Sequence, residues 1–286
     1  MARRFESAQA FRTSLETRLR SEAERRRVPL ATLRTKVLIE RLLARLFARD
    51  DAPWLLKGGY SFELRYRPRA RTTRDVDLSV PGERKWVLAQ VTEALRQAAE
   101  GDLGDFLVFE LGEPRGELRG PPGGGTRLPV VVRLSGKVYG SFHLDVALGD
   151  PEISDPEELV GDDHLGFAAI APARVRCIPR EQQFAEKIHA YTFPWDDREN
   201  TRVKDLVDLV VLIERGALDG MKTSDALVRT FEARRRQRLP IGLPPPPRAW
   251  QQDFRVLASE AGTVRGDLES GFELVSSFWE ELGLRP

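Results

Sequence analysis

Two aspartates separated by one residue are the strongest chemical feature of the sequence. Asp75 and Asp77 occur in DVDLSV, whose alternation of polar and apolar residues predicts a β-strand. Successive side chains alternate across a strand, so both carboxylates should lie on one face, a few ångströms apart. Two anions that close repel each other unless a cation neutralises them or one takes up a proton. A divalent metal ion would supply that charge, and ordinary salt bridges to Arg71 and Arg74 are the structural alternative.

A pair of glycines lies one helix length before the aspartates. Gly58 and Gly59 follow the apolar run APWLL and Lys57, and they precede YSFELRY, which has helical spacing. This order predicts a strand, a glycine turn and a helix. The N-terminus of a helix suits a phosphate group, and glycine lets the backbone approach that phosphate closely.

A third acid, Asp145, lies in the alternating segment SFHLDVALGD. Its parity with His143 and Ala147 places it on the face opposite to the leucines, where it could line a polar cleft. A single aspartate on a strand can equally be structural.

The three features occur together in a recognisable order. The segment LLKGGYSFELRYRPRARTTRDVDLSV resembles the AbiEii and MenT family of nucleotidyltransferase toxins, which belongs to the polymerase-β-like superfamily. The later segments QQFAEKIHAY and NTRVKDLVDLVVL are similar to that family's lysine-bearing helix and its Arg-x-x-Asp helix. The resemblance covers roughly residues 30–215.

The resemblance implies roles for individual residues. The implied catalytic residues are Asp75, Asp77, Asp145, Lys187 and Asp205, of which Asp75, Asp77 and Asp145 would hold Mg²⁺ or Mn²⁺. The implied nucleotide-binding residues are Lys57, Gly58, Gly59, Arg74, Lys187 and Arg202. Without that context, Lys187 would be a surface lysine paired with Glu186 or Glu181, and Asp208 would pair with Lys204.

The resemblance also implies a function. It is the metal-dependent transfer of a nucleoside monophosphate from an NTP to an RNA 3′ end, with the acceptor end of tRNA as the expected substrate. The protein would act as a toxin held in check by a cognate antitoxin. Two alternatives remain: the acceptor is a protein hydroxyl or a small molecule, or the protein binds RNA or a partner without catalysis.

The elements that must position these residues follow from periodicity. We expect an α+β fold, in which a mixed-sheet nucleotidyltransferase core is flanked by helices and followed by a helical C-terminal lobe. The expected segments are residues 1–50 with basic helices, 51–180 with the core and 181–286 with the lobe. Residues 6–27 predict an arginine-rich helix with little apolar face, and helical spacing is expected to return from residue 155. A stripe of Trp86, Val87, Val91 and Leu95 predicts another helix, and residues 239–247 predict a polyproline-like spacer.

Composition narrows the class of protein. The chain has 286 residues, 41% hydrophobic and 31% charged, with a formal net charge of +1. Residues 1–49 nevertheless hold thirteen Arg or Lys against five Glu, and RRRQR at 234–238 is a second basic cluster, so both could face a polyanion. One cysteine and three scattered histidines make a zinc site improbable and favour oxygen ligands for any metal. No apolar run approaches the roughly 20 residues of a membrane span, so we expect a cytoplasmic protein.

Overall fold

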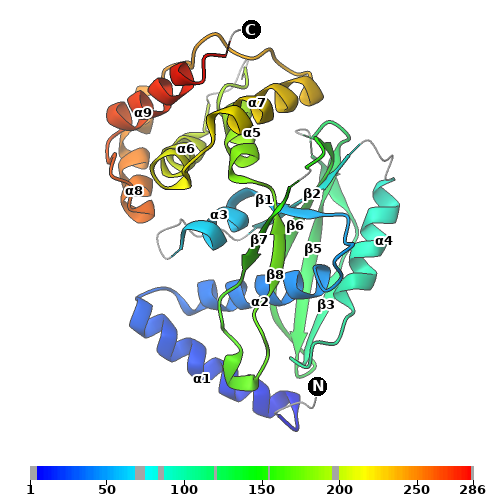
Figure 1. The fold of residues 1–286 in the computed structure, drawn as a ribbon. Helices are drawn as coiled ribbons and strands as arrows, with labels where there is room; N and C mark the ends of the chain where they lie inside the picture. Colours follow the sequence, from blue (N-terminus) through cyan, green and yellow to red (C-terminus); the bar gives the residue numbers. More distant parts are fainter. Residues whose placement is uncertain are drawn as a thin grey trace. The chain divides into compact units, whose positions relative to one another are not determined.

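A computed structural model describes residues 5–67, 75–82, 87–118, 121–153, 155–194 and 200–284 (Figure 1). The chain divides into two compact units. The sheet unit comprises Met1–Leu64, Thr73–Gly149 and Pro156–Cys177. The helical unit comprises Arg65–Thr72, Asp150–Asp155 and Ile178–Pro286. The three segments expected from the sequence stay a prediction.

One mixed β-sheet organises the sheet unit. Within the described residues it has eight strands in the order β3-β5-β6-β2-β1-β8-β7, with β4 paired to β5. Strands β1 and β8 run parallel, whereas β1 and β2, β3 and β5, β4 and β5, β5 and β6, and β7 and β8 are antiparallel. The sheet confirms the predicted α+β class. The strands are β1 (Leu55–Lys57), β2 (Asp75–Pro81), β3 (Leu107–Leu111), β4 (Arg115–Glu117), β5 (Gly125–Leu134), β6 (Lys137–Asp150), β7 (Glu157–Val160) and β8 (Arg174–Cys177).

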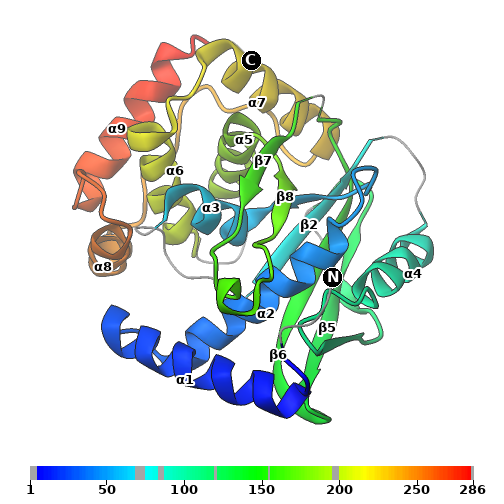
Figure 2. The ribbon, with the colours of Figure 1, turned by 60° about the horizontal axis from the view of Figure 1, so that its bottom comes forward.

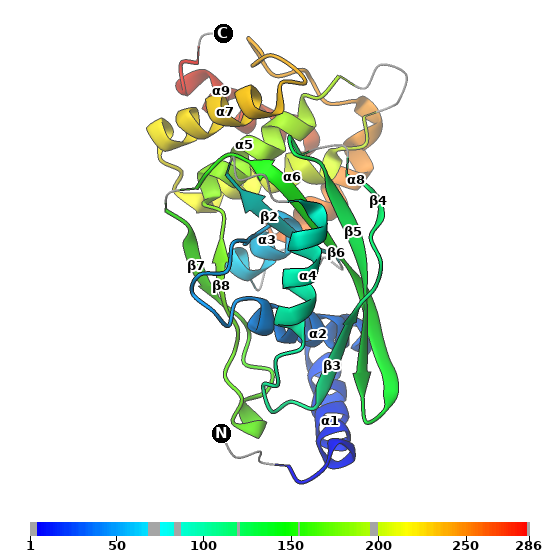
Figure 3. The same ribbon diagram turned by 90° about the vertical axis from the view of Figure 1, so that its right-hand side faces the viewer.

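The longest strands, β5 and β6, form a hairpin, which Figure 3 shows side by side. Leu134 pairs with Lys137, so only Ser135 and Gly136 form the turn, and both have positive φ, at 56° and 73°. This is the pattern of the two-residue turns whose twist matches the twist of the flanking strands.

Helices cover the apolar face of this sheet. They are α1 (Ala8–Arg26), α2 (Leu30–Leu46), α3 (Gly58–Tyr66), α4 (Leu88–Ala99) and the 3₁₀ turn η1 (Gly166–Ala168). Helices α2 and α4 contact each other, and α1 packs on α2 (Figures 1 and 2). Their leucines share one core with alternate residues of the strands, such as Leu56, Val76, Leu78 and Leu144. The neighbouring residues of those strands therefore point to the opposite face.

Helix α1 differs from the expectation of little apolar face. Phe11, Leu15, Leu19 and Ala23 are all buried, and their spacing of four residues places them on one side of the helix. The stripe is narrow because the other positions are charged, which is why the average composition hides it.

Helix α4 also begins later than its apolar residues suggest. Val91 and Leu95 are buried as predicted, but Val87 precedes the helix and is 59% exposed. Trp86 lies outside the described residues.

Several cationic side chains of the basic N-terminal segment form ion pairs inside the sheet unit. Arg41 and Arg45, both on α2, are buried and donate to the carboxylate of Asp105, at 2.8 and 2.6 Å. Burial alone would raise the pKa of Asp105, but these guanidiniums outweigh it and the pKa is lowered. Lys36 likewise pairs with Glu63. The positive charge counted in the sequence is therefore in part structural.

The last two strands of the sheet were not predicted from the sequence. Residues from 155 were expected to be helical, whereas β7 and β8 form an antiparallel pair that extends the sheet beyond β1. The segment RVRC alternates exposed and buried positions along β8, so Val175 and Cys177 face the core. Four-residue strands are too short to separate from helical patterns by periodicity.

The helical unit is built from five helices among its described residues. They are α5 (Arg180–Tyr191), α6 (Val203–Gly216), α7 (Gly220–Arg234), α8 (Gln251–Ala261) and α9 (Leu268–Glu281), with the 3₁₀ turn η2 (Arg248–Trp250) before α8. Helix α6 is central, because α5, α8 and α9 all pack against it. The inward stripe predicted for α6 is confirmed, since Val203, Leu206, Val207, Val210 and Val211 are buried.

The proline-rich segment between α7 and η2 is anchored to this unit. The Tyr191 hydroxyl donates to the carbonyl oxygen of Pro244 at 2.7 Å, and the Trp250 indole N–H donates to the carbonyl oxygen of Asn200 at 2.9 Å.

In the described part of the chain, no helix is both long enough and apolar enough to cross a bilayer.

Candidate active site

The turn between β1 and α3 fits glycine for two independent reasons. Gly58 has φ +65°, a conformation that disfavours residues with a Cβ. A Cβ built on Gly58 would also lie 2.1 Å from Oδ2 of Asp77. The start of α3 therefore lies directly against the Asp77 carboxylate. Gly59, the second predicted glycine, lies in the first turn of α3.

The predicted acids of the sheet unit lie on one face, opposite to the hydrophobic core. Lys57 on β1 is directly opposite Asp77 on β2, and directly opposite residues share a face. Asp75 shares that face by alternation, and its Oδ1 lies 3.9 Å from Nδ1 of His143 on the adjacent strand β6. Asp75 is about half exposed, which leaves its carboxylate accessible from solvent.

Asp145 has a partner that the sequence did not suggest. Arg127 lies directly opposite it on β5, and its Nε and Nη2 donate to the two carboxylate oxygens, both at 2.7 Å. The hydrogen bonds that Arg127 donates to Asp145 raise the pKa of the Arg127 guanidinium, and the charges of Asp75 and Asp77 add to this rise. Arg127 therefore belongs to the same cluster of charges. The alternation of TRLPVVV would have placed it on the polar face, but not opposite Asp145, because register is set by pairing.

The donor set on this face suits a hard divalent cation. Carboxylates on alternate residues of one strand are the oxygen ligands that Mg²⁺ and Mn²⁺ prefer. Asp75 and Asp77 are placed to provide them. Asp145 differs from these two acids because its carboxylate accepts two hydrogen bonds from Arg127. Among the described residues, the ligand atoms of Asp75, Asp77 and Asp145 do not all lie within 4.8 Å of one another.

The remaining predicted residues lie in the helical unit. Nζ of Lys187 on α5 lies 2.6 Å from Asp208 and 3.1 Å from Asp205, both on α6. Lys187 and Asp208 are buried. The alternatives considered from the sequence, Lys187 with a glutamate on its own helix and Asp208 with Lys204, do not describe these contacts. Helix α6 presents both aspartates to one lysine because residues three apart share a helix side.

Asp205 has a second contact, with a residue at the start of its own helix. Nη1 of Arg202 lies 3.5 Å from its Oδ2, and the Arg202 side chain is 43% exposed. Asp205 thus connects a buried lysine to an accessible arginine. Arg74 and Arg71 lie outside the described residues.

Comparisons with known proteins bear on the fold and the family of the chain. MenT4, a nucleotidyltransferase toxin from Mycobacterium tuberculosis H37Rv, matches with a TM-score of 0.53 at 15% sequence identity, covering 89% of this chain and 93% of that chain. An antigenic nucleotidyltransferase-like protein from Paracoccidioides brasiliensis gives a TM-score of 0.39 at 18% identity, covering 70% of this chain and 88% of that one. The antibiotic-resistance factor ANT(2″)-Ia gives 0.36 at 20%, covering 72% and 94%. No curated protein sequence matches.

The likeness to MenT4 shows that the chain has the fold of a nucleotidyltransferase. The family model described as "Nucleotidyl transferase AbiEii toxin, Type IV TA system" matches residues 41–278, which is most of the chain. The chain therefore belongs to the AbiEii family of nucleotidyltransferase toxins, and the resemblance inferred from the sequence is confirmed.

Proposed function

We propose that this nucleotidyltransferase transfers a nucleoside monophosphate from an NTP to the 3′ end of tRNA in the cytoplasm, with Mg²⁺ or Mn²⁺ and with release of pyrophosphate, and that a cognate antitoxin restrains it. One observation carries the catalytic part of the proposal. The pairings of β1, β2, β5 and β6 bring Lys57, Asp75, Asp77, Asp145 and Arg127 to one polar face, beside the glycine turn that begins α3.

The NTP would bind at this turn with its triphosphate toward the acids. The N-terminus of α3 carries a partial positive charge, and Gly58 has no side chain that would block the phosphates from the backbone N–H groups. Lys57 adds a full positive charge opposite Asp77. A divalent ion bound by Asp75 and Asp77 would neutralise the charge that develops on the attacking and leaving oxygens.

Asp145 and Arg127 would act as a pair. In the bidentate arrangement Arg127 holds the Asp145 carboxylate on the polar face, ready to assist the ion or to accept the proton of the attacking hydroxyl. Arg127 is 44% exposed and can also reach a phosphate oxygen. Its charge offsets the repulsion among the three acids until the metal and the NTP arrive.

Within the helical unit, Lys187 and Arg202 would bind the nucleotide and Asp205 would orient both side chains. Arg202 is the more exposed of these two cations, so it is the better placed to donate hydrogen bonds to a phosphate. The antitoxin is supported by the family description as a toxin of a toxin–antitoxin system. The RNA acceptor follows from the resemblance described from the sequence. The basic N-terminal helices offer fewer positive charges for binding RNA than their composition suggests, because Arg41 and Arg45 are buried in ion pairs.

The test is incubation of the purified protein with each labelled NTP, Mg²⁺ and either tRNA or total RNA. The variant Asp75→Asn removes a ligand charge at a half-exposed site without changing side-chain shape, and Asp50→Asn is a matched control on an exposed aspartate of the same unit. We expect label in tRNA with the wild type and Asp50→Asn, and loss of transfer with Asp75→Asn and Asp77→Ala.

The position of the label decides between acceptors. Label that stays in protein or in a small molecule would refute the RNA acceptor while keeping the transferase. Full transfer by Asp75→Asn and Asp77→Ala would refute the assigned site. Growth inhibition that survives Asp77→Ala would show that toxicity comes from binding rather than from catalysis.

A further inference from the structure

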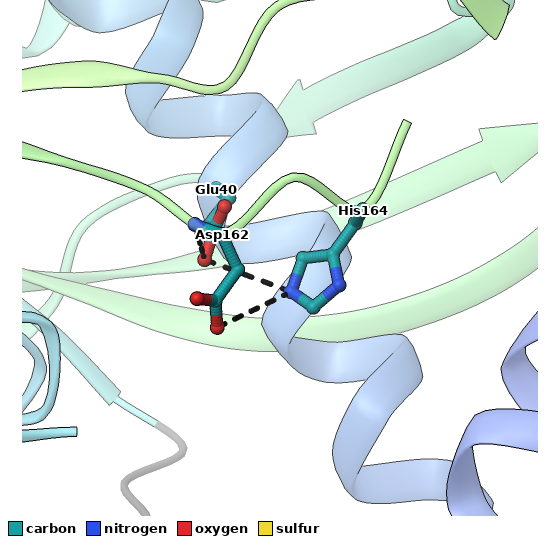
Figure 4. Close-up of side chains that lie close together, drawn as sticks. All are labelled: Glu40, Asp162 and His164. Carbon is teal, nitrogen blue, oxygen red and sulfur yellow. Dashed lines mark hydrogen bonds and ion pairs between the residues drawn. The ribbon is translucent and has the colours of Figure 1, made fainter. Parts of the chain in front are cut away.

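A second cluster of potential metal ligands lies on the opposite side of the sheet from the acids described above. Glu40 comes from α2, which packs on the hydrophobic face, and Asp162 and His164 come from the segment after β7 (Figure 4). Their ligand atoms all lie within 4.8 Å of one another. The cluster joins parts of the chain that are more than 120 residues apart, so the spacing of histidines along the sequence could not indicate it.

The carboxylate of Glu40 is buried and held in place. The Glu40 residue is 3% exposed, and its Oε1 accepts hydrogen bonds from the Tyr60 hydroxyl at 3.3 Å and from the Asp162 backbone N–H at 3.1 Å. A Cβ on Gly161 would lie 2.5 Å from Glu40 Oε2, so glycine allows the loop to approach this closely. The loop is thereby fixed against α2 with the Asp162 side chain beside Glu40.

His164 supplies the second, independent observation. Its side chain is 9% exposed, and its Nε2 is buried without a hydrogen-bond partner among the described residues. Figure 4 shows this nitrogen pointing toward the two carboxylates, 3.7 Å from Glu40 Oε1 and 3.9 Å from Asp162 Oδ2. A buried ring nitrogen aimed at two carboxylates, but too far for a hydrogen bond, is unusual for a purely structural group.

The separations suit a bound ion. Bonds of about 2.0–2.2 Å to a tetrahedral ion place neighbouring ligand atoms roughly 3.4 Å apart. The observed 3.7 and 3.9 Å need to contract by only a few tenths of an ångström. A cavity of about 10 Å³ adjoins the three side chains, which is close to the space of one water molecule. The ion could therefore keep a water as its fourth ligand.

The ligand types select the ion. Two carboxylates and an imidazole form a mixed oxygen and nitrogen set, which Zn²⁺ accepts readily and which Mg²⁺, with its preference for six oxygens, does not. We propose that Glu40, Asp162 and His164 form a Zn²⁺ site that ties the segment after β7 to helix α2, separate from the nucleotidyl-transfer site. Because it anchors backbone on the core side of the sheet, its role is to stabilise the sheet unit.

The experiment measures Zn²⁺ content directly on the full-length protein. After removal of metals with EDTA and dialysis against Zn²⁺, the wild type should retain one ion per chain more than His164→Asn by elemental analysis. The ion should be lost in His164→Asn and retained in His143→Asn, a matched control because His143 lies beside Asp75 on the other face. The variant Asp75→Asn should also retain it. Added Zn²⁺ at about 100 times its Kd should raise Tm of the wild type, but not of His164→Asn, by roughly 5–10 °C.

Two further measurements keep the proposal refutable. If His164→Asn does not fold by circular dichroism, Asp162→Asn takes its place, since that side chain is 29% exposed. Co²⁺ bound to the wild type should give visible absorption bands typical of low coordination number. Absence of stoichiometric Zn²⁺, retention of the ion by folded His164→Asn or Asp162→Asn, or its loss in His143→Asn would each overturn the proposal, whatever the transferase assay shows.

Discussion

The contact between Gly58 and Asp77 allows the sharpest test of the site. In Gly58→Ala the new methyl group would lie 2.1 Å from the carboxylate oxygen of Asp77, whereas nonbonded carbon and oxygen need more than about 3 Å. The carboxylate must therefore move by about 1 Å, or the start of α3 must move instead. A misplacement of that size in a catalytic constellation can reduce the rate by about 100-fold.

The control variant Gly136→Ala measures the effect of backbone strain alone on stability and on the transfer rate. Gly136 has φ +73°, close to the +65° of Gly58, but a Cβ there meets nothing within 4 Å. Both variants should lose a similar roughly 1–2 kcal/mol of folding free energy, because alanine is strained in the left-handed region. Only Gly58→Ala carries the additional displacement of Asp77.

The assay compares nucleotidyl-transfer rates and urea unfolding of the two variants side by side. We expect Gly136→Ala to keep the wild-type rate to within a few fold and Gly58→Ala to lose about 100-fold. If both variants transfer nucleotides equally fast while losing equal stability, then the position of Asp77 is not critical and its assigned role is wrong.

Two predictions concern the helical unit. Asp208→Asn should lower the free energy of unfolding in urea by roughly 1.5–3 kcal/mol, because it weakens the buried contact of 2.6 Å to Lys187. Asp205→Asn should lower the free energy of unfolding less and the transfer rate more than Asp208→Asn does. The opposite result, with Asp208→Asn the slower enzyme and Asp205→Asn the less stable one, would contradict the assignment of Asp205 to nucleotide binding. Burial, and secondarily Arg234, lowers the pKa of His189 from 6.5 to about 4, so the unfolded chain binds more protons between these values and stability is lost as pH falls through this window. Unfolding free energy should drop by about 1–2 kcal/mol more from pH 7.5 to pH 5 in the wild type than in His189→Gln, and equal drops in the two proteins would exclude His189 as the cause.

Local pattern determined much of this fold. Alternation places DVDLSV on a strand with Asp75 and Asp77 on one face, and the pair of glycines ends β1 and begins α3. The stripe of α6 is equally local, since it depends only on helical periodicity. These features need no knowledge of the partner elements, and they carried the family resemblance that the family match later confirmed.

Pairing partners were decided only by the tertiary structure. Arg127 meets Asp145 because β5 and β6 pair in one particular register, and a shift by one residue would turn Arg127 to the other face. Lys187 contacts Asp208 rather than a neighbour on its own helix because α5 packs on α6. Glu40, Asp162 and His164 meet because the segment after β7 folds back on α2. Periodicity fixes which face a side chain occupies, whereas the distance between side chains on different elements depends on packing that no local pattern encodes.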